Sequence, residues 1–288
     1  MMVNSLAKEF TYQIGWRSKG RHPGRHASVQ RGLGMDFVGH APLISYPDPR
    51  RIDLRLTLRD PFEQVFVRIF NQRSSTPIFV ACDLSGSMGF LGEHHKLHIA
   101  AEITASAAYS ASRASDPFSF IGFDNQVRED WISHASTRVQ GAYELAERLK
   151  DYRPEQVAGE GILGVSAHLS RERALVFLVS DFHMPLDVLE EAINSMQRHH
   201  IVPIVLWDAA EYKKLPEFGI THVMDSETGE RRSLFLRGDM HARIQASFAE
   251  RREALYQLFM RYDFPPFFVE DGFDANSLTE YFYQFLGA

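Results

Sequence analysis

One carboxylate and two hydroxyls stand close together in the first third of the chain. Asp83, Ser85 and Ser87 come directly after the apolar residues 78–82. A short apolar run bounded by turn residues is typical of a buried strand, and a helix-like pattern follows at 96–115, so the three side chains are expected on a strand-to-helix loop. Carboxylate and hydroxyl oxygens are ligands that hard divalent cations such as Mg²⁺ or Ca²⁺ prefer. The loop is therefore a candidate metal site.

Further acidic residues follow other predicted strands. Asp181 ends the apolar run 175–180, and Asp124 ends the run 118–123. Because the carboxyl ends of parallel strands meet at one edge of a sheet, we expect Asp181 to lie near Asp83. Asp124 either joins this site or is a turn residue. The alternative for the first loop is that Asp83 and Ser87 cap a turn and bind no metal.

The pattern Asp-x-Ser-x-Ser at 83–87 resembles the metal-ion-dependent adhesion site of von Willebrand factor A domains. The resemblance implies that Asp83, Ser85, Ser87 and Asp181 are metal ligands. It also implies a threonine from a second loop, where this sequence has Gly161 instead. Glu160 is the residue expected to supply the missing oxygen; otherwise the site binds metal weakly or not at all.

Three further motifs resemble a bacterial family of von Willebrand A-like proteins of unknown function that accompany MoxR-type AAA+ ATPases. They are Arg-Arg-Ile-Asp-Leu at 50–54, Asp-Ala-Ala-Glu at 208–211 and Asp-Ser-Glu-Thr-Gly-Glu at 225–230. Within the family, residues 47–61 look most like the MxaS branch of methanol-oxidation gene clusters. The resemblance implies a non-enzymatic adaptor or assembly protein. Its implied partners are a MoxR-type ATPase and other von Willebrand A-like proteins, with methanol dehydrogenase as a client to be matured or loaded with metal.

Enzymatic patterns match less well. A haloacid-dehalogenase-like phosphatase needs a second aspartate two residues after the first, and Ser85 stands there. The nucleophile elbow Gly-x-Ser-x-Gly is not matched at Ser85 or Ser87. His94 and His98 lie one helical turn apart, but no third zinc ligand accompanies them. The alternative that stays open is a metal-dependent hydrolase of phosphoesters that uses the same loops.

The order of strand-like and helix-like segments predicts the fold class. From 76 onward they alternate, which is typical of an α/β protein whose mostly parallel central sheet is flanked by helices, as in a von Willebrand A-like Rossmannoid domain. We expect this domain at 76–288, and at 1–75 an extended N-terminal segment packed on it, with an antiparallel edge strand at 65–70. Strands are expected near 77–83, 118–123, 174–180, 201–207 and 266–270, with a hairpin at 221–236; helices near 96–114, 139–150, 162–171, 186–199, 240–261 and 275–286.

Composition limits the class of protein. The 288 residues are 44% hydrophobic and 24% charged, as in ordinary globular proteins. The net charge of −6 disfavours nucleic-acid binding, although residues 1–60 hold ten Lys and Arg against five Asp and Glu. No run of eighteen apolar residues and no signal-peptide pattern occurs, and Cys82 is the single cysteine. We therefore expect a cytoplasmic protein without membrane insertion.

Overall fold

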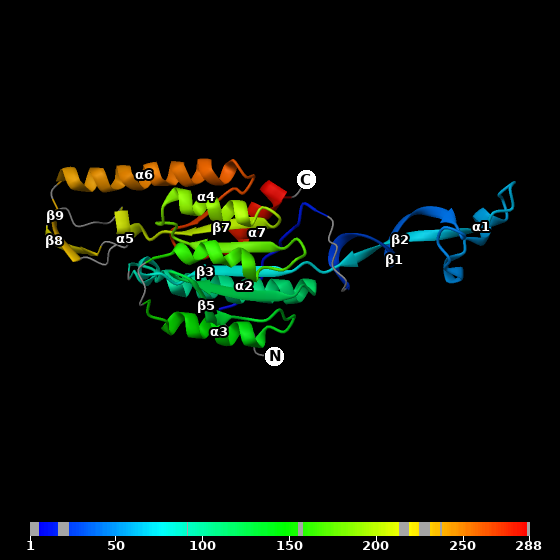
Figure 1. Cartoon of the computed structure of the whole chain (residues 1–288), viewed down its shortest axis with the longest axis horizontal. Coiled ribbons are helices and arrows are strands. Elements are labelled where there is room, and N and C mark those ends of the chain that lie inside the picture. The colour runs from blue at the N-terminus through cyan, green and yellow to red at the C-terminus, as the bar shows by residue number, and fades with distance from the viewer. Residues whose placement is uncertain are drawn as a thin grey trace. The chain divides into compact units, whose positions relative to one another are not determined.

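Figure 1 shows the computed structural model of the chain, which describes residues 6–16, 23–90, 92–154, 158–212, 219–224, 231–236 and 238–286. The chain divides into two compact units. One contains the residues up to Gln13 together with those from Pro77 onward, and the other is Ile14–Thr76. The candidate metal ligands all belong to the first unit.

The first unit is built on a six-stranded sheet in the order β10-β7-β6-β3-β4-β5. All neighbouring pairs are parallel except β4 with β5. The strands are β3 (Ile78–Asp83), β4 (Phe118–Phe123), β5 (Val127–Ile132), β6 (Leu175–Ser180), β7 (His200–Leu206) and β10 (Phe267–Val269). The predicted α/β class with a mostly parallel sheet is confirmed, and the fold is von Willebrand A-like.

Helices cover the sheet (Figure 1). They are α2 (Lys96–Ala114), α3 (Gln140–Asp151), α4 (Leu186–Ser195), α5 (Ala209–Tyr212), α6 (Gly238–Met260) and α7 (Ala275–Leu286), with 3-10 helices η2 (Gly86–Gly89) and η3 (Glu160–His168). All six residues of β3, β4 and β6 are buried, because a parallel sheet covered on both faces needs apolar side chains on both. The segment 162–171, predicted as an α-helix, lies largely in the 3-10 helix η3.

Alternate residues of β6 face opposite layers of the core. Val176 and Leu178 belong to a cluster with Leu189 of α4 and Phe259 of α6. Phe177 instead packs edge-on against Phe282 of α7, at 6.1 Å between ring centroids, and against Phe10. The two layers fix β6, and with it the position of Asp181 at its end.

Residues 6–13 are part of the same unit. The backbone N–H of Phe10 donates to Ser110 Oγ of α2 at 3.0 Å, and the hydroxyl of Tyr12 donates to the buried carboxylate of Asp116. The ring of Phe10 stacks on Phe282 with centroids 6.3 Å apart. This short N-terminal stretch therefore closes the apolar layer between α2 and α7.

The second unit is a β-hairpin. β1 (Pro23–Pro42) pairs antiparallel with β2 (Phe66–Ser74), and between them lie η1 (Pro49–Arg51) and α1 (Leu54–Thr57). An antiparallel strand is thus present at 65–70, but its partner is β1 and not the first core strand. That residues 1–75 pack on the core as an extension stays a prediction.

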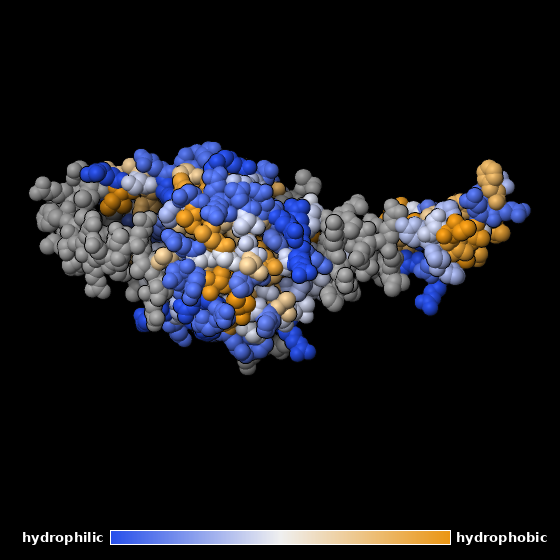
Figure 2. Space-filling model, in the orientation of Figure 1, coloured by the Kyte–Doolittle hydropathy of each residue, from blue (hydrophilic) through white to orange (hydrophobic). Residues whose placement is uncertain are grey.

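The segment that joins β1 to β2 carries exposed apolar side chains. Asp48 and Asp53 cap η1 and α1 by accepting backbone N–H bonds from Arg50 and Leu56. Figure 2 shows orange, apolar surface on this unit. Its most exposed large apolar residues are Ile44 at 95%, Leu54 at 68%, Leu58 at 84% and Phe62 at 79%.

A second antiparallel pair joins β8 (Gly219–Met224) to β9 (Arg231–Leu236), as the sequence predicts for 221–236. The intervening motif at 225–230 lies outside the described residues. Within the described ranges, no helix combines the length and the apolar character needed to span a bilayer.

The pKa of His200 allows a test of how deeply the start of β7 is buried. The imidazole is buried at the start of β7 with its ring 5.5 Å from that of Phe264, and burial, aided by the charge of Arg173, lowers its pKa from 6.5 to about 4. The unfolded chain takes up a proton near pH 6.5 and the folded chain only near pH 4. The free energy of unfolding should therefore fall by up to about 3 kcal/mol between these values as the pH drops.

Urea unfolding of wild type and His200→Gln between pH 7 and pH 4.5 measures this effect. The variant should lose part of the pH dependence, whereas His168→Gln, which changes an exposed histidine, should keep it. Equal pH dependence in wild type and His200→Gln would contradict the buried, neutral state of this imidazole.

Candidate metal centre

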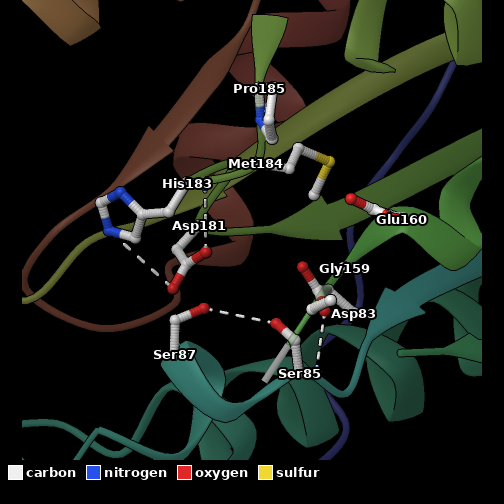
Figure 3. Close-up of a pocket in the computed structure, with 10 residues that line it drawn as sticks. Asp83, Ser85, Ser87, Gly159, Glu160, Asp181, His183, Met184 and Pro185 are labelled. Carbon is white, nitrogen blue, oxygen red and sulfur yellow. Dashed lines mark hydrogen bonds and ion pairs between the residues drawn. The ribbon is translucent and has the colours of Figure 1, made fainter. Parts of the chain in front are cut away.

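A pocket of about 150 Å³ lies at the carboxyl edge of the sheet, where β3 and β6 end side by side. Figure 3 shows its lining, which includes all five residues named from the sequence: Asp83, Ser85, Ser87, Glu160 and Asp181. This volume leaves room for a small cation together with bound waters.

The first loop presents its oxygens to this pocket through a tight turn. Asp83 Oδ1 accepts the backbone N–H of Ser85 at 2.8 Å, and Asp83 Oδ2 accepts the hydroxyl of Ser180 at 2.7 Å. Ser85 is the N-cap residue of η2 but makes no side-chain capping bond, and its Oγ lies 3.3 Å from Ser87 Oγ. Asp83 therefore shapes the turn, while the two serine hydroxyls are directed toward each other at the pocket.

The third loop is anchored from two sides. The indole N–H of Trp207 donates to the carbonyl of Asp181 at 2.9 Å. The guanidinium of Arg251 on α6 donates to the carbonyls of Phe182, at 3.2 Å from Nε, and of Met184. Phe182 has a φ of 52°, a left-handed conformation that bulky residues seldom adopt. These bonds hold Asp181 at the pocket in spite of that local strain.

The two buried carboxylates have different electrostatic surroundings. Burial, together with the nearby charge of Asp181, raises the pKa of Asp83 to about 6. Burial is the largest influence on Asp181 and would also raise its pKa, but the charges of Lys96 and His183 and the hydrogen bonds from Lys96 and Ser87 together outweigh it and hold that pKa well below its usual range. In the described part of the chain no ion pair joins Asp83 to a cationic side chain. A divalent cation would supply the missing positive charge, so the residues present fit a metal ion.

The second loop differs from the predicted alignment. Gly159 faces the pocket, since a Cβ at this position would lie 3.3 Å from Asp83 Oδ2. Gly161 packs against the backbone of Gln126, where a Cβ would come within 2.5 Å, and does not line the pocket. Glu160 lines the pocket with an exposed side chain.

Two other sequence candidates have structural roles. The buried carboxylate of Asp124 accepts a bond from Arg128 at 2.8 Å and from the backbone N–H of Gln126, so it closes the turn between β4 and β5. The imidazole of His98 contacts the carbonyl of Lys150 at 3.3 Å, and its ring stacks on that of His95. Neither Asp124 nor His98 lines the pocket.

Sequence reasoning missed three residues at this edge, namely Lys96, His183 and Glu211. Lys96 Nζ lies 2.8 Å from Asp181 Oδ2 and 2.6 Å from Glu211 Oε1. Ligand atoms of Asp181, His183 and Glu211 lie within 4.8 Å of one another, close enough to share a metal ion. The available signal was the Asp-Ala-Ala-Glu element at 208–211, because it follows β7, which is the neighbour of β6.

The fold is consistent with a von Willebrand A-like domain, and the pocket gathers a cluster of oxygen ligands at the carboxyl edge of its sheet. A family model described as "Protein of unknown function DUF58" matches residues 47–254. The chain belongs to this family.

One curated relative comes from Paracoccus denitrificans and is called "Uncharacterized protein in moxR 3'region". It is 28% identical over 98 residues, which are 34% of this chain and 93% of the relative. Similar solved structures include the conserved hypothetical protein BatB from Bacteroides thetaiotaomicron, at 13% identity and a TM-score of 0.44 over 74% of this chain and 98% of that one. An aerotolerance-related membrane protein from Bacteroides fragilis NCTC 9343 gives 13% identity and a TM-score of 0.41 over 74% and 99%.

Alanine substitutions of Gly161 and of Gly141 form a matched pair that tests how closely the second loop packs. Gly161→Ala should lower the free energy of unfolding by about 1–3 kcal/mol, since its methyl group meets the Gln126 backbone and not a flexible side chain. Gly141→Ala, in α3 with no atom within 4 Å of the new Cβ, should leave stability unchanged or raise it by up to about 1 kcal/mol. Urea unfolding compares them; a Gly161→Ala variant as stable as wild type would contradict the close approach of this loop to the turn between β4 and β5.

Proposed function

We propose that this protein is a non-enzymatic adaptor for a MoxR-type AAA+ ATPase, and that it binds its partner through a divalent cation at the described pocket. The observation that carries the proposal is the grouping of Asp83, Ser85, Ser87 and Asp181 around one open pocket. Mg²⁺ and Ca²⁺ take oxygen ligands and keep positions for water, so a cation held by three side chains still offers a site to a partner's carboxylate.

The choice of partner is supported by the relative in Paracoccus denitrificans, whose name refers to the moxR 3' region. The resemblance of residues 47–61 to the MxaS branch extends the proposal to the maturation or metal loading of methanol dehydrogenase, together with other von Willebrand A-like proteins. In this proposal residues 76–288 are the von Willebrand A-like domain, residues 1–75 are its N-terminal extension, and the complex forms in the cytoplasm.

The geometry of the pocket supports a role for each residue. Asp83 would be the carboxylate ligand, Ser85 and Ser87 the hydroxyl ligands, and Asp181 a ligand direct or through water. Glu160 would replace the hydroxyl that the second loop lacks, since Gly159 faces the pocket there. When bound, the cation would polarise and attract an acidic group of the partner.

A second candidate function rests on the same open pocket with its oxygen ligands. A metal ion held there could activate a water for phosphoester hydrolysis. Turnover of p-nitrophenyl phosphate and bis(p-nitrophenyl) phosphate with Mg²⁺ or Mn²⁺ separates the two functions. The adaptor proposal expects no turnover above the metal-only blank.

Asp83→Ala is expected to abolish binding both of Mn²⁺ and of the ATPase while the protein stays folded. The loss of two accepted hydrogen bonds should cost only about 1–3 kcal/mol, which a domain of this size can tolerate. A pull-down with the ATPase, with Mn²⁺ titrations by calorimetry and circular dichroism on the same samples, measures the effect.

Glu172→Ala is the matched control, because Glu172 is an exposed acid just before the amino end of β6, at the opposite edge of the sheet. It should bind the ATPase like wild type. If folded Asp83→Ala also retains the ATPase, the interface is elsewhere and the adaptor proposal in this form is wrong.

A further inference from the structure

A lysine ammonium is buried at the edge of the candidate metal centre. Lys96, the first residue of α2, is only 1% exposed, and its Nζ donates to Asp181 Oδ2 at 2.8 Å, Glu211 Oε1 at 2.6 Å and the carbonyl of Ser87 at 3.3 Å. An ammonium has three donors, and here each has an acceptor. Lysine is almost never fully buried unless it is paired, so this position requires those acceptors.

The ammonium shares two residues with the proposed metal ligands. Asp181 gives Lys96 one of its carboxylate oxygens, and Ser87 gives it a carbonyl while the serine hydroxyl faces the pocket. A divalent cation on the hydroxyl of Ser87 would therefore lie close to a fixed positive charge. Both cations are attracted to the carboxylate of Asp181 and repel each other, so the ammonium at this position weakens the binding of a divalent cation.

The lysine is held in place by the loop that follows β7. Glu211 uses Oε1 for Lys96 and Oε2 for the backbone N–H of Asp208 at 3.0 Å. Asp208 in turn accepts the backbone N–H of His94 at 2.7 Å, and a Cβ on Gly92 would lie 2.3 Å from the Asp208 carboxyl carbon. The Asp-Ala-Ala-Glu element thus fixes the segment just before α2 and brings Glu211 to the lysine on that helix.

We propose that Lys96 is a built-in competitor of the divalent cation. Its ammonium neutralises Asp181 and Glu211 in the metal-free protein and keeps the affinity of the pocket for a divalent cation low. Tight metal binding then requires an additional anionic ligand, which an acidic side chain of a partner would supply. This inference rests on the metal site of the proposed function and adds to it a reason why metal and partner would bind together.

The alternative position for a metal, between Asp181, His183 and Glu211, leads to the opposite expectation for Glu211. An ion there would need Glu211 as a ligand and would have to displace the ammonium from between the two carboxylates. In the competitor arrangement Glu211 is not a metal ligand, so its loss together with the lysine does not harm metal binding.

Mn²⁺ binding to the purified full chain, measured by calorimetry and by the electron paramagnetic resonance of the free ion, tests the proposal. Lys96→Met removes the charge and keeps the length of the side chain, and it should bind Mn²⁺ at least about tenfold more tightly than wild type. Lys96→Met/Glu211→Gln removes one cation and one anion, so its pocket has the net charge of wild type. It should still bind more tightly than wild type, because Asp181 is released.

The double variant also guards against misfolding. Lys96→Met alone takes the ammonium away from the buried Asp181 and the partly buried Glu211, and breaking a buried ion pair destabilises proteins strongly, whereas in the double variant only Asp181 loses its partner. Circular dichroism and urea unfolding, with and without Mn²⁺, check both. If Lys96→Met is unfolded without Mn²⁺ and folds when Mn²⁺ is added, the competition is supported as well.

Three results would overturn the proposal. Mn²⁺ affinities of both variants equal to or below that of wild type would show that the lysine does not compete. A gain in Lys96→Met that is lost in the double variant would place the ion on Glu211. Absence of Mn²⁺ binding in all three proteins would remove the competition together with the metal site. The ATPase pull-down is a separate measurement, so a failed adaptor role and a failed competition are distinguishable.

Discussion

Asp83 and Asp181 are two carboxylates buried in one pocket at the carboxyl edge of the sheet, and the arrangement of that edge depends on how their charge is neutralised. An isolated buried charge is costly, so each needs a counter-charge, hydrogen bonds or a proton. Asp181 has the ammonium of Lys96. Asp83 has two accepted hydrogen bonds, and its pKa is raised by burial and by the charge of Asp181.

The loops around this pair are fixed by bonds that do not involve the pocket itself. Trp207 and Arg251 hold the backbone after Asp181, and Asp208 holds the segment before α2. The carboxylates, hydroxyls and ammonium are therefore already in place before any ion or partner arrives. The ligands are preorganised, and the ammonium of Lys96 competes with a divalent cation for them. Such a site is suited to binding the cation and an acidic partner together.

Much of the fold and the core of the site could be predicted from sequence, because the signals are local. Continuous apolar runs identified β3, β4 and β6, and the acids that end β3 and β6 had to lie at one edge once the strands were parallel. In strand β5 only Trp131 is buried and the other five residues are partly buried or exposed, so it lacks such a run and the sequence does not predict it. The pairing of β1 with β2 was missed because residues 15–50 show no period.

The rest of the site depends on contacts between distant residues. Lys96 looks like an ordinary polar residue at a helix start, and only the three-dimensional structure brings it to Glu211, 115 positions away along the chain. The place of the missing threonine could not be fixed from sequence because a loop has no period. Gly159 and Gly161 stand on either side of Glu160, and the sequence does not tell which of them faces the pocket. The contact of Gly161 with the backbone of Gln126 shows that it is Gly159.

The central claim is that Asp83, Ser85 and Ser87 hold one divalent cation in the described pocket. Anomalous diffraction at the manganese edge, from crystals of the full chain soaked in Mn²⁺, tests this claim most directly. The account predicts one peak within about 2.5 Å of oxygens of Asp83, Ser85 or Ser87, with Lys96 still on Glu211 or turned away from Asp181. A peak bounded by Asp181, His183 and Glu211, or no peak in a pocket whose side chains are well ordered, would contradict it.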